Sequence, residues 1–161
     1  MAIPPATFKT RASLLDRLID AAPSEKRELR PLRTMDRPDI RAAVSRDLGW
    51  LLNTRTPLTA EEFETRELTV IDFGVPDFGK GTPESFKDQK LRAALTEKAI
   101  RVFEPRLQDV KVSIAAAMDS ERALRMTIEA VMVADDVREP VSFRTIYDSK
   151  TGTMEINAEQ Y

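Results

Sequence analysis

The sequence predicts an α+β fold, in which N-terminal helices pack on one face of a mainly antiparallel four-stranded C-terminal sheet. Before residue 107, apolar residues recur every three or four positions, which is the period of a helix. After residue 106 they recur at every second position, which is the period of a strand. Turn-forming segments separate the alternating runs, as in a meander. Helices followed by strands are the pattern of an α+β domain.

Composition excludes several kinds of chemistry. The 161-residue chain has no cysteine and no histidine, which removes disulfides, thiolate catalysis, cysteine-ligated zinc and the commonest general base. We therefore predict no cofactor and no metal site. The net charge of −2 argues against a nucleic-acid partner. No apolar run approaches the roughly 20 residues of a membrane span, and the N-terminus lacks a hydrophobic signal core. We expect a cytoplasmic protein without membrane insertion.

We divide the chain into an N-terminal arm with a short helix and a linker (1–35), one α+β domain (36–157) and a tail (158–161). Within the arm, residues 13–20 predict a helix capped by Ser13, followed by a proline-punctuated linker over 21–35. This helix is too short to be stable alone. Its apolar side chains share one face and are expected to bind a partner or a neighbouring copy: Leu14, Leu15, Leu18 and Ile19.

The domain begins with a helix from Asp36 to about residue 53, with Asp36 as N-cap. Trp50 lies off its apolar stripe, which consists of Ile40, Val44, Leu48, Leu51 and Leu52. Residues 59–67 predict a further helical turn. The run at 68–79 is interpreted as an extended segment that enters a tight loop.

The central helix of the chain is predicted to open at Thr82-Pro83-Glu84 and to run to Phe103. Its expected buried face consists of Leu91, Ala94, Leu95, Ala99, Val102 and Phe103. Four strands are expected around 110–114, 124–132, 141–147 and 153–156, with turns at 119–122 and 148–152.

Glu104-Pro105-Arg106 ends the central helix. Proline disfavours helical geometry in the residue before it and has no amide hydrogen, so we expect a stiff corner that presents two exposed charges. One interpretation is a helix stop whose solvated pair adds little to folding. Another makes Glu104 the acid of a hydrolase, with Asp109 or Asp77 as the second carboxylate. Nothing in the sequence places two carboxylates at a working separation.

Four motifs occur in the order found in one known family. They are the Ser13–Leu18 segment, Val44–Arg55 with its Leu51-Leu52-Asn53-Thr54-Arg55 end, Phe73-Gly74-Val75-Pro76-Asp77, and Phe103-Glu104-Pro105-Arg106-Leu107. With this order the chain resembles TssE, the baseplate subunit of bacterial type VI secretion systems. TssE belongs to the wider phage-tail baseplate wedge family, which carries a historical lysozyme-like label.

The resemblance implies a non-enzymatic assembly protein at the cytoplasmic side of the inner membrane. Its implied partners are the baseplate proteins TssF and TssG, together with the sheath proteins TssB and TssC, whose polymerisation begins at the baseplate. Glu104, Pro105 and Arg106 would bind the wedge proteins. The alternative, from the family label, is a peptidoglycan hydrolase.

Overall fold

The computed structural model of this 161-residue protein describes residues 10–18, 24, 34–77, 86–116, 123–135, 137–148 and 153–158. The chain forms two compact units, residues 1–43 and 44–161, and the boundary between them falls inside helix α2 (Arg37–Asn53). The predicted domain boundary at residue 36 stays a prediction.

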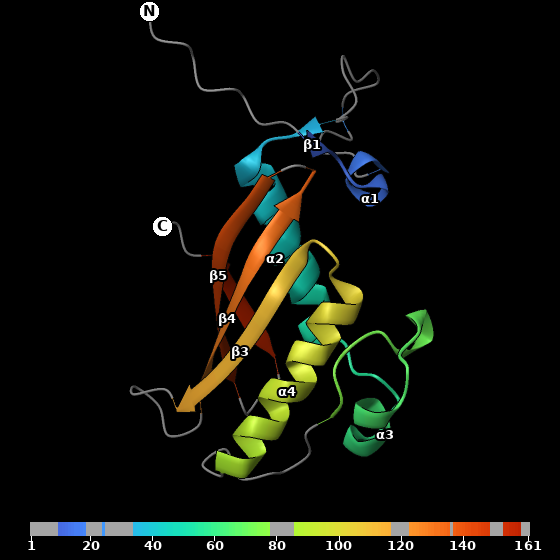
Figure 1. Ribbon diagram of the computed structural model, residues 1–161, viewed down its shortest axis with the longest axis vertical. Coiled ribbons are helices and arrows are strands. Elements are labelled where there is room, and N and C mark those ends of the chain that lie inside the picture. The colour runs from blue at the N-terminus through green and yellow to red at the C-terminus, as the bar shows by residue number, and fades with distance from the viewer. Residues whose placement is uncertain are drawn as a thin grey trace, which may run out of the picture. The chain divides into compact units, whose positions relative to one another are not determined.

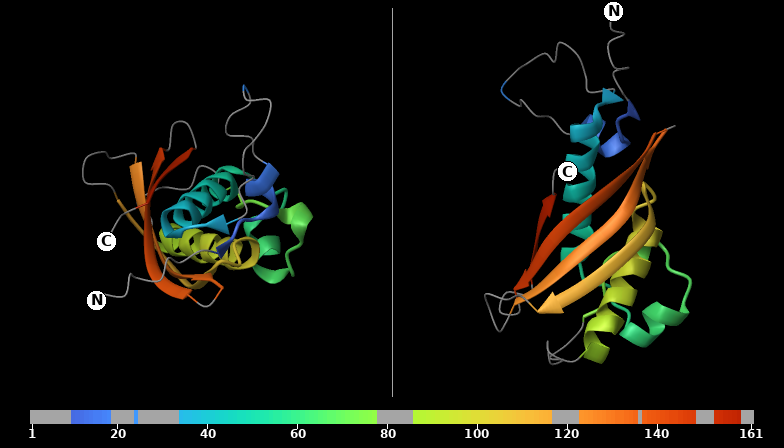
Figure 2. Two further views of the ribbon diagram at one scale, coloured as in Figure 1. Left: turned by 90° about the horizontal axis from the view of Figure 1, so that it is seen from above. Right: turned by 60° about the vertical axis from the view of Figure 1, so that its left-hand side comes forward.

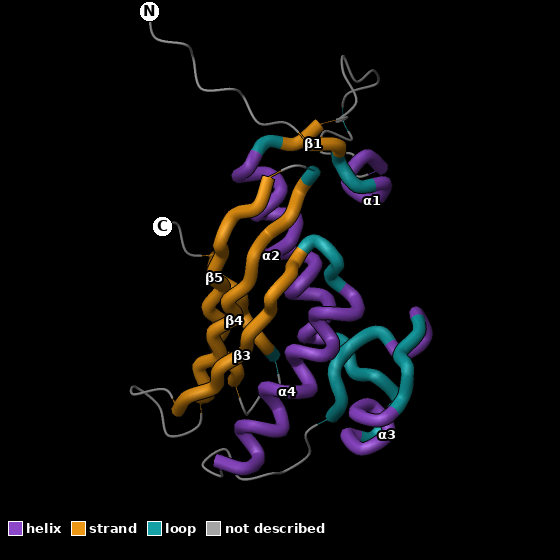
Figure 3. Tube along the Cα trace, viewed as in Figure 1, coloured by secondary structure: helices purple, strands orange, loops and turns teal. Residues whose placement is uncertain are grey.

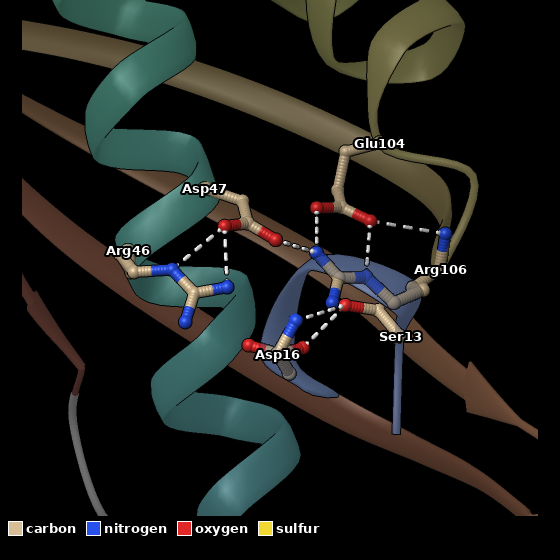
Figure 4. Close-up of polar contacts among 6 residues, drawn as sticks. All are labelled: Ser13, Asp16, Arg46, Asp47, Glu104 and Arg106. Carbon is tan, nitrogen blue, oxygen red and sulfur yellow. Dashed lines mark hydrogen bonds and ion pairs between the residues drawn. The ribbon is translucent and has the colours of Figure 1, made fainter. Parts of the chain in front are cut away.

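The first unit contains two short strands and a short helix. Strand β1 (Thr10–Arg11) pairs antiparallel with β2 (Thr34–Met35). The linker prediction is therefore wrong for its last two residues, because backbone pairing was not visible in so short a segment. Helix α1 (Leu14–Leu18) follows Ser13, whose Oγ accepts a hydrogen bond from the Asp16 amide at 3.1 Å and donates to Asp16 Oδ2 at 2.5 Å (Figure 4). The predicted cap is confirmed, and residues 19–20 lie outside the described residues.

Helix α2 begins as predicted. The Asp39 amide donates to Asp36 Oδ1 at 3.1 Å, and the Asp36 amide donates to Asp39 Oδ2 at 3.2 Å, so each carboxylate caps the other's backbone. Trp50 is exposed, whereas the predicted stripe is buried throughout: Ile40, Val44, Leu48, Leu51 and Leu52.

The second unit contains the sheet, whose strand order is β3-β4-β5-β6 with every neighbour antiparallel (Figures 1 and 3). The strands are β3 (Leu107–Ala116), β4 (Ala123–Ala134), β5 (Val137–Asp148) and β6 (Met154–Ala158). Alternate residues of β4 and β5 are buried: Leu124, Met126, Ile128, Ala130, Met132, Val141, Phe143 and Thr145. The predicted α+β class is confirmed. The predicted turn at 119–122 lies outside the described residues, and so does the predicted turn at 148–152 except for Asp148, which is the last residue of β5.

Helix α4 (Phe86–Phe103) and the C-terminal part of α2 cover the same face of this sheet (Figure 2). The buried face predicted for α4 is partly wrong, because Leu91, Ala94 and Val102 are exposed. The face that packs inward instead includes two polar residues. It consists of Arg92, Leu95, Thr96, Ala99 and Ile100. The prediction used apolar residues only. Because the buried face of α4 contains Arg92 and Thr96, the predicted face points in a different direction around the helix. The predicted helix start at residues 82–84 lies outside the described residues.

Between α2 and α4 the chain forms helix α3 (Ala60–Thr65) and the 3₁₀ turn η1 (Val70–Asp72). The extended segment expected here is therefore wrong. The Thr69 amide and hydroxyl donate to Asp72 Oδ2 at 2.8 and 2.9 Å, and the Asp72 amide donates to the Thr69 carbonyl at 2.9 Å. These reciprocal hydrogen bonds form a turn in a segment whose apolar residues alone had indicated a strand.

Gly74 allows the chain after η1 to approach the end of α2. The Val75 amide donates to the Thr54 carbonyl at 2.9 Å, and the Thr56 amide donates to the Val75 carbonyl at 3.1 Å. Gly74 has a φ of 124°, and a Cβ there would lie 2.6 Å from the Thr54 carbonyl oxygen. Only glycine combines this left-handed backbone with so close a contact.

We predict that Gly74→Ala lowers the free energy of unfolding by about 1–3 kcal/mol, because the new methyl group adds backbone strain and a backbone clash. Gly49→Ala is the matched control, since nothing lies within 4 Å of the added Cβ in α2. That control should gain about 0.5–1 kcal/mol from helix propensity. Urea denaturation of both variants measures the difference, and equal stabilities would contradict the prediction.

Candidate functional site

The motif Glu104-Pro105-Arg106, here called the docking corner, joins α4 to β3. The Glu104 amide donates to the Ile100 carbonyl at 2.8 Å and closes the last turn of the helix. The Leu107 amide then donates to the Glu104 carbonyl at 3.0 Å, which reverses the chain into β3. Pro105 is exposed at the tip. The prediction that the helix ends at this proline is confirmed.

Arg106 is held by two carboxylates from different parts of the chain (Figure 4). Its Nε lies 2.6 Å from Glu104 Oε1 and its Nη2 lies 2.5 Å from Glu104 Oε2, which is a bidentate pair. The same Nη2 lies 2.5 Å from Oδ2 of Asp47 in α2. The guanidinium is thereby fixed both to the end of α4 and to α2.

The expectation of two exposed charges is wrong. Glu104 is only 4% exposed, and the Arg106 side chain retains 27% of its exposure. The Arg106 carbonyl accepts a hydrogen bond from the Val133 amide at 2.8 Å, so the corner is also attached to β4. The sequence shows a proline stop but not this packing, because Asp47 and Val133 are distant along the chain.

The surroundings of Arg106 act on its pKa in opposite directions. Burial by itself lowers the pKa of the guanidinium, whereas the hydrogen bonds and charge of Glu104, followed by those of Asp47, raise it. The net result is a pKa above the ordinary value. Because a raised pKa stabilises the fold at every pH below the unfolded value, this contribution is fully present throughout the physiological range.

A second arginine extends the network along α2. Arg46 Nε and Nη2 lie 2.9 and 2.8 Å from Asp47 Oδ1, so Asp47 binds a different arginine through each oxygen (Figure 4). The Arg46 guanidinium also lies 5.0 Å from the ring centre of Trp50. Sequence reasoning missed Asp47 and Arg46 as members of the site. Their only signal was their position within the Val44–Arg55 motif.

Three of the motifs singled out in the sequence meet in this unit. The Gly74 loop contacts the end of α2, as described above. The rings of Phe73 and Phe103 then contact edge to face, with centroids 5.3 Å apart and planes at 66°. The loop motif therefore lies between the end of α2 and the docking corner.

The corner is not arranged for acid catalysis. Both Glu104 oxygens accept hydrogen bonds from Arg106, so the candidate acid is already engaged by an arginine of the same chain. Within the described ranges, no group of acidic side chains is placed to hold a metal ion. The arrangement is suited to positioning an arginine.

The family described as baseplate wedge protein gp25 matches residues 38–137, which is more than half of the chain. The chain belongs to this family. It is a structural, non-enzymatic protein of the baseplate wedge, and the hydrolase alternative is thereby excluded. No curated protein matches the sequence. In the part of the wedge protein that the structure describes, no helix is long and apolar enough to cross a membrane.

One outer edge of the wedge protein's sheet is β3, and side chains of α4 bind its backbone. Arg101 Nη2 lies 3.3 Å from the Val110 carbonyl, and the Val112 amide lies 3.4 Å from Glu97 Oε2. Glu97 and Arg101 also form an ion pair at 2.6 Å. A bulge between Gln108 and Lys111 overlaps the start of this stretch. The middle of β3 is thus protected against pairing with another chain.

The other outer edge is β6, and Asn53 binds its first residue. Asn53 Nδ2 donates to the Met154 carbonyl at 2.9 Å, and the Met154 amide donates to Asn53 Oδ1 at 2.8 Å. In an antiparallel pair, the N–H and C=O groups of one residue point to the same side of the strand. Both backbone groups of Met154 therefore point away from β5. The same alternation turns the backbone groups of Ile156 and Ala158 outward. Asn53 of α2 thus occupies the outward backbone groups at the start of β6. The next outward backbone groups along the strand are those of Ile156 and Ala158.

The predicted partner-binding side chains of α1 lie in the first unit. Leu14 is 70% exposed and Leu18 is 72% exposed, and Leu15 is about half exposed. Ile19 lies outside the described residues. These exposures agree with an apolar face that is not buried in its own unit.

We predict that Arg106→Ala lowers the free energy of unfolding by about 3–5 kcal/mol, because it leaves the buried Glu104 carboxylate unpaired. Arg106→Lys should recover only part of this loss, since lysine cannot form the bidentate fork. Arg101→Ala is the control, because losing its exposed ion pair with Glu97 and its hydrogen bond to the Val110 carbonyl leaves no buried charge unpaired and should cost only about 1–2 kcal/mol.

Chemical denaturation of the three variants beside the parent protein provides the measurement. An Arg106→Ala variant that is no less stable than Arg101→Ala would show that the buried pair does not stabilise the fold.

Proposed function

We propose that this wedge protein is a TssE-type subunit of a type VI secretion baseplate. It binds TssF and TssG through the docking corner and helps to start the sheath of TssB and TssC at the cytoplasmic side of the inner membrane. The gp25 family also fits the wedge of a contractile phage tail. The proposal for TssE rests on the sequence resemblance and on the geometry of the corner.

The observation that carries the proposal is the fixed Arg106. Glu104 and Asp47 bind its Nε and Nη2, so the guanidinium is held in one orientation. The preceding residue, Pro105, is exposed, and the Arg106 side chain is itself 27% exposed, so part of the guanidinium remains accessible. A partner that supplies a carboxylate or carbonyl oxygen meets donors that are already oriented, which reduces the ordering cost of binding. Glu104 is then a positioning residue.

We predict that Pro105→Lys prevents co-purification with TssF and TssG while it lowers stability by no more than about 1 kcal/mol. Pro105 is exposed, so the substitution loses only the restriction that proline places on the unfolded chain. The lysine adds bulk and a like charge beside Arg106. Pro57→Lys makes the same change at another exposed proline and should bind normally.

Two results would count against this assignment. Normal co-purification of folded Pro105→Lys would remove the corner from the interface. A parent protein that ignores TssF and TssG, yet enters the wedge of a phage-like particle, would replace the secretion system with a phage tail.

The proposed contact with the sheath lies at β6. Strand addition to a sheet edge needs outward backbone groups, and the central part of β3 is bound by α4. On β6 the outward positions begin after Met154, at Ile156. A strand from TssB or TssC would pair there, and Asn53 would limit how far it extends toward the start of β6.

We predict that Ile156→Pro impairs sheath polymerisation but leaves co-purification with TssF and TssG intact, because it removes one outward amide from an edge strand that tolerates proline. Ile156→Ala retains this amide and should polymerise normally. Electron microscopy of sheaths, together with the co-purification, separates the effects. If the proline variant loses both activities, β6 is a folding element rather than a template.

The exposed leucines of α1 complete the proposal. In addition to the docking corner and β6, an apolar contact with a wedge partner or a neighbouring copy is formed by Leu14, Leu15, Leu18 and Ile19. Support comes from the exposure of the three described leucines and from the shortness of the helix, which gains stability from being covered.

A further inference from the structure

Two adjacent apolar side chains on η1 are unusually exposed. Val70 is 84% exposed and Ile71 is 80% exposed, more than any other large apolar side chain among the described residues. Both project from a three-residue turn, here called the apolar tip. Neither is used by the docking corner or by the sheet edges.

The apolar tip is rigid because both of its ends are fixed. Thr69 and Asp72 cap each other, as described above, and the Asp72 carboxylate is buried in the turn. Its hydrogen bonds from Thr69 lower the pKa of Asp72, so the cap is present at neutral pH and is lost only as the pH falls below the ordinary value of 3.8. On the far side, Phe73 contacts Phe103, and Gly74 lies against Thr54.

The neighbouring helix α3 is also fixed. Lys98 Nζ donates to the carbonyls of Phe63, Glu64 and Arg66 at 2.8, 2.8 and 2.9 Å. One ammonium group thus satisfies three carbonyls at the C-terminal end of α3. At the other end, Thr59 and Glu62 form a capping box. The apolar tip therefore stands on a scaffold that is already ordered.

Residues 59–77, here called the acidic segment, surround the tip in sequence. Six carboxylates and one arginine give this segment a net charge of −5, whereas the whole chain has −2. The exposed acids are Glu61, Glu62, Glu64, Glu67 and Asp77. An apolar projection from a segment with a net negative charge specifies its partner by charge as well as by shape.

We propose that the apolar tip inserts into an apolar pocket with a lysine- and arginine-rich rim on another protein of the baseplate wedge. A symmetric contact between two copies would bring two acidic segments together, which like-charge repulsion disfavours. Anionic lipid surfaces are repelled for the same reason. A protein pocket with a basic rim would match the negative charge of the acidic segment and would bury the side chains of Val70 and Ile71. This proposal uses the family membership of the chain and is independent of the docking corner and of β6.

The first test uses Val70→Ser/Ile71→Ser in the full chain, expressed in its own host, with recovery in purified wedge complexes as the readout. We expect recovery to fall at least about tenfold, because two large apolar side chains no longer become buried. Val102→Ser is the matched control, since Val102 is also exposed but lies on α4. All variants should melt close to the parent protein because the altered side chains are exposed.

The second test identifies the neighbour. A photo-crosslinking residue at position 71 should attach to a different wedge protein, at an apolar site flanked by lysine or arginine. Glu64→Lys/Glu67→Lys should weaken recovery, and high salt should weaken binding of the parent protein. The proposal is overturned by unchanged recovery of the serine variant, by crosslinks only to a second copy or to lipid, or by a crosslinked site without basic residues.

Discussion

The bidentate pair between Arg106 and Glu104 is the interaction on which the rest of the site depends. A buried carboxylate without a partner costs several kcal/mol, roughly 3–5, and Glu104 is 4% exposed. The fold therefore requires Arg106 in one orientation. Asp47 binds the same guanidinium from α2, so the requirement extends to the position of that helix. The partner contact proposed at the docking corner would therefore use an orientation that the fold already requires.

Helix α2 connects this pair to the rest of the unit. Asp47 binds the docking corner, and one turn and a half later Asn53 binds the backbone of Met154 in β6. Gly74, which follows η1 in the chain, lies against Thr54 at the end of α2. Its backbone can approach so closely only because it has no side chain. A displacement of α2 would therefore be felt both at the corner and at the open sheet edge. This arrangement gives a physical reason for the sequence motif at the end of α2.

Besides the apolar face of α1, the other three proposed contacts differ in chemistry: they are the docking corner, β6 and the apolar tip. The docking corner offers oriented guanidinium donors, β6 offers outward backbone groups, and the apolar tip offers two aliphatic side chains within a negative segment. Each selects a different kind of complementary surface. A wedge protein that joins several neighbours benefits from such differences, because one partner cannot readily occupy the site of another. The absence of catalytic chemistry in the family agrees with this distribution of function over surfaces.

The sequence by itself determined the fold class, the caps at Ser13 and Asp36, the buried stripe of α2 and the end of α4 at Pro105. These features depend on local spacing and capping, which act between residues a few positions apart. Tertiary structure alone decided that Glu104 is buried, because its environment includes Asp47 and Val133, which are remote in sequence. It likewise rotated the buried face of α4 toward Arg92 and Thr96, and it exposed Val70 and Ile71. An apolar residue tends to be buried, but the neighbours that pack against it in the tertiary structure determine whether it is.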